Sequence, residues 1–84
     1  MAMRLLAAHK EPERDKALEL KMAEEALQAA LAELRLRERQ YLDAPVGDER
    51  IHDARLLRLQ AAELMYTAAR LEYMAAIDAV KAME

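Results

Sequence analysis

Glu49 and His52 are side chains that could together bind a metal ion. They lie three residues apart in the stretch LDAPVGDERIHD, residues 42 to 53. On a helix, a Glu-x-x-His spacing places both side chains on one face, as in the ligand sets of di-iron four-helix bundles. A complete site of that kind needs further carboxylates directed into the same core. The segment expected opposite, residues 39 to 42, carries no carboxylate. We therefore keep metal binding at Glu49 and His52 as the alternative, and expect this stretch to be a corner of the fold without a cofactor.

The rest of the sequence contains no combination of residues that is typical of a catalytic centre. Cysteine and serine are absent, and Thr67 is the only hydroxyl residue besides the tyrosines, so we expect no enzymatic activity. Without cysteine the chain has no disulfide, no thiolate zinc site and no thiol nucleophile. The net charge of −3 is spread over both halves, which argues against a nucleic-acid surface, since that requires clustered positive charge. The most basic stretch, ELRLRERQ at residues 33 to 40, is expected to be a solvated surface with internal ion pairs, and a patch for acidic or phosphate groups is its alternative.

The first eleven residues contain an apolar run, Leu5 to Ala8, that is too short for a signal-peptide core or a membrane span. We expect a flexible N-terminal arm over residues 1–11, which includes His9, no membrane insertion and a cytoplasmic protein. The alternative is an arm that becomes ordered when it docks on a partner.

Proline and glycine divide the rest of the chain into two long segments rich in Ala, Leu, Glu and Arg, the best helix formers. Pro12 suits the first turn of a helix, and Pro45 disfavours helical geometry at the residue before it. Gly47 permits a turn, and Asp48 is a good N-cap for a second helix. The sequence therefore predicts an all-α, coiled-coil-like antiparallel hairpin as a single domain over residues 12–84, with a helix about 12–43, a turn 44–48 and a helix about 49–83.

A hairpin turning between Pro45 and Val46 would place residue i level with a residue near 91 − i. In this register, leucine faces leucine and alanine faces alanine. The expected pairs are Leu20 with Leu71, Leu27 with Leu64, Leu34 with Leu57, Ala23 with Ala68 and Ala30 with Ala61. Such layers are typical of a coiled-coil seam, so we expect these residues to hold the hairpin together.

The second helix carries another stripe, nearly opposite that seam, in which large and small residues alternate. The Tyr–Ala stripe consists of Leu59, Ala62, Tyr66, Ala69, Tyr73, Ala76 and Val80. If the first helix covers the leucines, this stripe is left bare, and proteins in water rarely leave so large an apolar patch exposed. It is therefore the predicted partner interface, with a weaker line at Met22, Ala29 and Leu36 bordering it. We expect a non-catalytic adaptor, co-chaperone or assembly subunit that binds itself or a helical protein partner, with dimerisation completing a helical bundle.

The stretch HDARLLRLQAAELMYTAARLEYMAA, residues 52 to 76, resembles the alanine-rich helices of TolC-like outer-membrane factors. In layout the chain is similar to small hairpin co-chaperones and to the needle subunits of type III secretion, although Pro45-Val46-Gly47-Asp48 stands where the needle subunits have a Pro-x-x-Pro turn. These resemblances are analogies of shape, and they imply a coiled-coil hairpin.

Overall fold

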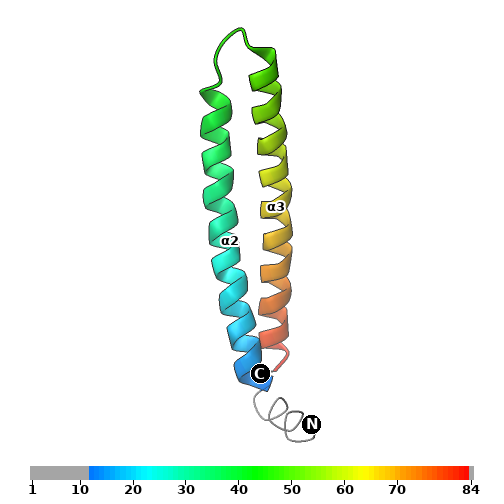
Figure 1. Ribbon diagram of the computed structural model, residues 1–84. Helices are drawn as coiled ribbons and strands as arrows, with labels where there is room; N and C mark the ends of the chain where they lie inside the picture. Colours follow the sequence, from blue (N-terminus) through cyan, green and yellow to red (C-terminus); the bar gives the residue numbers. More distant parts are fainter. Residues whose placement is uncertain (1–11, 84) are drawn as a thin grey trace, which may run out of the picture.

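The computed structural model describes residues 12–83, which form two helices packed side by side and no strand. Helix α2 spans Pro12–Leu42 and helix α3 spans Glu49–Lys81, and they run antiparallel (Figure 1). At 1.5 Å per residue, the helices are about 46 and 50 Å long. The radius of gyration is 19.1 Å, against about 12 Å for a compact domain of this length. The expected all-α hairpin is confirmed, whereas the N-terminal arm and His9 lie outside the described residues.

Residues 43–48 form the corner between the two helices. The amide of Asp43 donates to the carbonyl of Arg39 at 2.9 Å, which closes the last turn of α2. Gly47 has φ +94°, a left-handed conformation that costs a residue with a side chain more than it costs glycine. Asp48 is extended, at φ −109° and ψ 92°, and its carboxylate accepts from the amide of Ile51 at 3.3 Å. Asp48 is thus the N-cap of α3, as the sequence indicates.

The packed face of α2 is the expected one. Its half-buried residues include Leu20, Ala23, Leu27, Ala30 and Leu34. On α3, the expected face is wrong. Leu57, Leu64 and Leu71 are 65%, 72% and 62% exposed, and their alanine neighbours Ala61 and Ala68 are exposed as well.

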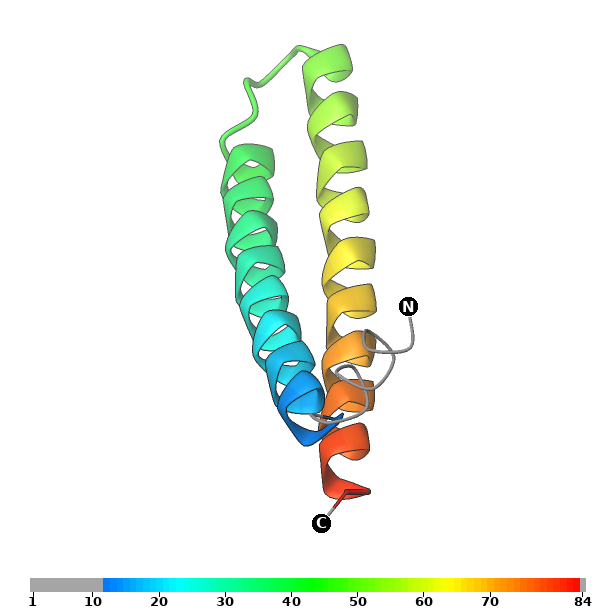
Figure 2. The ribbon, with the colours of Figure 1, turned by 60° about the horizontal axis from the view of Figure 1, so that its bottom comes forward.

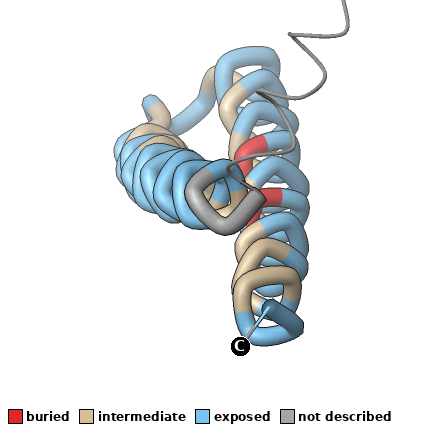
Figure 3. The backbone as a smooth tube through the Cα atoms, turned by 90° about the horizontal axis from the view of Figure 1, so that it is seen from below, coloured by how far each residue is buried: buried red, intermediate tan, exposed pale blue. Residues whose placement is uncertain are grey.

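The Tyr–Ala stripe takes the inner position instead. Ala62 and Ala69 are only 4% and 9% exposed, and the rest of the stripe is half-buried. Figure 3 shows the buried segments of α3 on the side toward α2, and Figure 2 shows the two helices along their length in a second view. The prediction that this stripe points away from α2 is therefore corrected: it is the hairpin's own contact.

A polar contact near the corner fixes this rotation of α3. The Arg55 guanidinium donates to the carbonyl of Gln40 at 2.7 Å. That carbonyl lies in the last turn of α2, where helix geometry leaves oxygens without an intrahelical donor and where positive charge is favoured. Arg55 shares its side of α3 with Leu59 and Ala62, so its contact with α2 turns the Tyr–Ala stripe inward and the leucines outward.

The register also differs from the expected one. The Arg55 side chain reaches the carbonyl of Gln40, and the ring centroids of Tyr41 and His52 lie 4.9 Å apart, so residues that face each other near the corner have numbers that sum to about 93 to 95 rather than 91. On α3, the small residues Ala62 and Ala69 are the ones buried against α2, which allows the two backbones to approach closely.

Candidate interaction surface

The metal candidate lies at the corner, on the first turn of α3. The His52 ring packs against Tyr41 in a tilted arrangement, with the ring centroids 4.9 Å apart and the planes at 51°, and its Nδ1 is 3.8 Å from a carboxylate oxygen of Asp53. Residues 44–49, 52 and 53 surround an open pocket of about 560 Å³ there. Within residues 12–83, no three His, Cys, Asp or Glu side chains come together in a way that could hold a metal ion. Among these described residues, Glu49 and His52 therefore have no third side chain that could complete a metal site.

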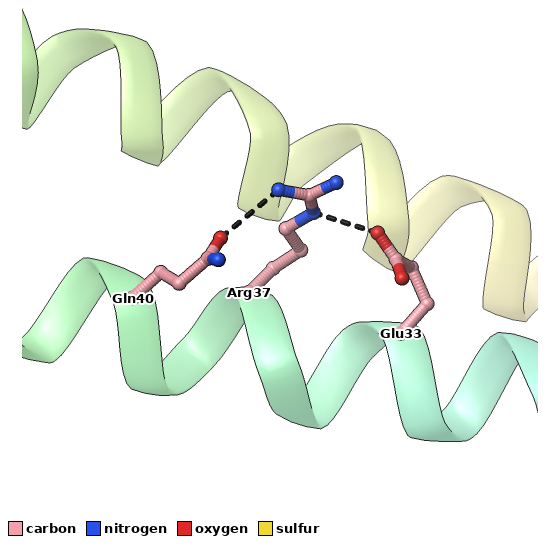
Figure 4. A network of polar contacts seen from close by, with 3 residues as sticks. All are labelled: Glu33, Arg37 and Gln40. Atoms are coloured by element: carbon pink, nitrogen blue, oxygen red, sulfur yellow. Dashed lines mark hydrogen bonds and ion pairs between the residues drawn. The ribbon is translucent and has the colours of Figure 1, made fainter.

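The basic stretch of α2 makes a short polar network (Figure 4). The Arg37 guanidinium donates to Glu33 at 2.7 Å and to the side-chain oxygen of Gln40 at 2.9 Å. All three residues belong to α2 and are half-buried along the groove beside α3. Because the guanidinium is held by a carboxylate and an amide of its own helix, the network orders this part of the hairpin surface.

The residues predicted as the partner interface are grouped on one face of α3, as expected, but they face α2. Tyr66 and Tyr73 are half-buried, and the guanidinium carbon of Arg70 lies 6.0 Å from the ring centroid of Tyr66. Ala62 and Ala69 have almost no accessible surface. A partner could reach this stripe only by displacing α2, so the surface that remains available on α3 lies elsewhere.

The available apolar surface is the face on which the leucines had been expected to hold the hairpin. Leu57, Leu64 and Leu71 recur every seven residues, and alanines recur at the same interval beside them. We call this exposed surface the Leu–Ala face; it consists of Ala54, Leu57, Ala61, Leu64, Ala68, Leu71 and Ala75. Met65 and Met74, 66% and 54% exposed, lie along its edges and add flexible apolar contact area.

The sequence identified these leucines but assigned them to the wrong contact. The volumes of the side chains in each layer could have assigned these leucines to the correct face. The expected seam stacked leucine on leucine and alanine on alanine, which gives layers of very unequal size, whereas the Tyr–Ala stripe and the α2 seam both alternate and fit each other when shifted by half a repeat.

No protein-family model matches the sequence, and no match was found among curated proteins or solved structures. Among residues 12–83, neither helix has an apolar stretch long enough to cross a membrane.

Proposed function

We propose that this chain is a non-catalytic interaction module of the adaptor, co-chaperone or assembly-subunit kind, located in the cytoplasm, which binds another helical surface through the outer face of α3. One observation carries the proposal: Leu57, Leu64 and Leu71 are each more than 60% exposed and form a single line along the helix. A heptad line of leucines flanked by alanines is the pattern that one helix presents to another in a coiled coil.

The energetics of the hairpin support the same function. Only Ala62 and Ala69 are buried among the described hydrophobic residues, so the contact of α2 with α3 removes little apolar surface from water. A single core in a chain of 84 residues is marginal even when it is well filled. Covering the Leu–Ala face would add the burial that the hairpin lacks, so binding and stability are expected to be coupled.

The chemistry of the remaining side chains supports a role without catalysis. The Thr67 hydroxyl donates to the backbone carbonyl of Glu63 at 3.0 Å, as is usual for threonine within a helix. The ion pairs among the described residues each lie within one helix, as between Lys16 and Glu19 at 3.9 Å. These contacts are typical of a helix surface and set no nucleophile beside a base.

The function is tested with two variants that make the same change in different places. Leu64→Glu places a charge on the Leu–Ala face, whereas Leu18→Glu changes a leucine of α2 that is 56% exposed. Light scattering reports self-association, and capture from the native host's lysate reports helical partners. We expect Leu64→Glu to abolish the interaction and Leu18→Glu to retain it. Equal behaviour of the two variants would show that the Leu–Ala face is not the binding surface.

A further inference from the structure

The Leu–Ala face has a pattern that specifies what covers it. In coiled-coil terms, alanine fills one core position of each heptad and leucine fills the other. The alanine position is held by Ala54, Ala61, Ala68, Ala75 and Ala82, and the leucine position by Leu57, Leu64 and Leu71. All eight residues are exposed. We propose that this face binds the same face of a second copy of the chain, with the two α3 helices antiparallel.

The sizes of the side chains favour the antiparallel orientation. In a parallel pair, equivalent core positions meet, so alanine would face alanine and leucine would face leucine. In an antiparallel pair, each core position meets the other kind, so every leucine meets an alanine. The register then sets Leu64 level with Ala68 of the second copy, Leu57 with Ala75 and Leu71 with Ala61.

The ends of the leucine series give an independent reason. Seven residues before Leu57 the leucine position is held by Arg50, and seven residues after Leu71 it is held by Asp78. Both residues are exposed. A parallel pair would place Arg50 against Arg50 and Asp78 against Asp78, and like charges at core positions repel. In the antiparallel register, Arg50 meets Ala82 and Asp78 meets Ala54, so no like charges face each other.

The charges that flank the face are complementary in this same register. Arg58 lies beside Glu72 of the second copy, and Asp53 lies beside Lys81 of the second copy. The two-fold symmetry repeats each pair, so four ion pairs would border the contact. Arg58 and Glu72 are 14 residues apart in one chain, about 21 Å along the helix, and Asp53 and Lys81 are twice as far apart. Neither pair can form within one α3, so their complementarity has an effect only between two copies.

The two-fold axis of the proposed dimer lies close to the middle of α3. The register places it level with Tyr66, one residue from the middle of Glu49–Lys81, so the two helices overlap along nearly their full length. Thr67 then lies next to Thr67 of the second copy, whereas Ala61 lies ten residues, about 15 Å, from its own counterpart. This pairing rests on the proposed function and adds to it the occupant, the orientation and the register.

Charge exchange tests the pairing directly. Arg58→Glu and Glu72→Arg each turn two attractions into repulsions, and we expect each to raise the dimer Kd about tenfold. The double variant Arg58→Glu/Glu72→Arg restores both pairs only if the copies are antiparallel, and it should return the Kd to within about threefold of the wild type. Circular dichroism checks that every variant remains helical. A double variant as weak as the single ones would overturn the proposal.

Single cysteines supply a second readout, because the natural chain contains none. A disulfide needs Cα atoms within about 7 Å. Under mild oxidation, Thr67→Cys should therefore form a covalent dimer and Ala61→Cys should not; the opposite result would indicate a parallel pair and overturn the proposal. A wild type that stays monomeric at high concentration would also overturn it, yet the proposed function would stand if Leu64→Glu still abolished capture of a helical partner.

Discussion

Enlarging the most tightly covered alanines is expected to destabilise the hairpin. In Ala69→Leu, the leucine side chain must enter a site on α3 that is 9% exposed and that faces α2. Extra methylene groups in a filled core cost about 1–3 kcal/mol, because neighbouring side chains leave their preferred rotamers or the helices move apart. With a urea dependence of about 1 kcal/mol per molar for so small a protein, the midpoint should fall by about 1 M or more.

The matched control is Ala29→Leu on α2, which makes the same change at an exposed position. Leucine and alanine have similar helix propensities, so its stability should stay within about 0.5 kcal/mol of the wild type. Both variants are compared by urea unfolding followed by circular dichroism at one fixed protein concentration. If Ala69→Leu unfolds at the wild-type midpoint, the Tyr–Ala stripe does not pack against α2 and the corrected register is wrong.

Further predictions concern the corner. Asp48→Ala should lower the free energy of unfolding by about 0.5–2 kcal/mol because the N-cap of α3 is lost, while Asp43→Ala, an exposed carboxylate before the turn, should change it little in the same urea assay. Arg55→Ala should cost about 1–3 kcal/mol, since the carbonyl of Gln40 loses a charged donor, and a wild-type midpoint in this variant would contradict the account of how α3 is rotated. Chelation with EDTA should leave the melting temperature unchanged, and stoichiometric zinc or iron that disappears in His52→Ala would revive the metal alternative.

The helices and the corner could be predicted from the sequence because local interactions determine them. Pro12 and Pro45 restrict where the first helix begins and ends, Gly47 accommodates a positive φ, and Asp48 caps α3. Each of these effects acts over a few residues and needs no knowledge of the partner helix. Helix α2 ends at Leu42, and helix α3 spans Glu49–Lys81.

The rotation and register of α3 could not be predicted in this way. Both faces of α3 are apolar and repeat about every seven residues, so periodicity alone does not say which one α2 covers. The choice depends on contacts between distant segments, among them the burial of Ala62 and Ala69 against α2 and the reach of Arg55 to the last turn of α2. The prediction of an available apolar face on the second helix remains useful, but the residues that form it are Leu57, Leu64 and Leu71.

The dependence of the melting temperature on protein concentration tests the central claim most directly, namely that the Leu–Ala face is completed by a second copy. Full burial of a leucine is worth about 1.5–3 kcal/mol, and each of the three leucines is about two-thirds exposed, so six in a dimer contribute about 6–12 kcal/mol before the cost of association. For a dimer of this size, the melting temperature should rise by about 4 °C for each tenfold increase in concentration. We expect this rise for the wild type and for Leu18→Glu, and a lower, concentration-independent melting temperature for Leu64→Glu. A wild-type melting temperature that does not change between micromolar and millimolar protein would contradict the claim.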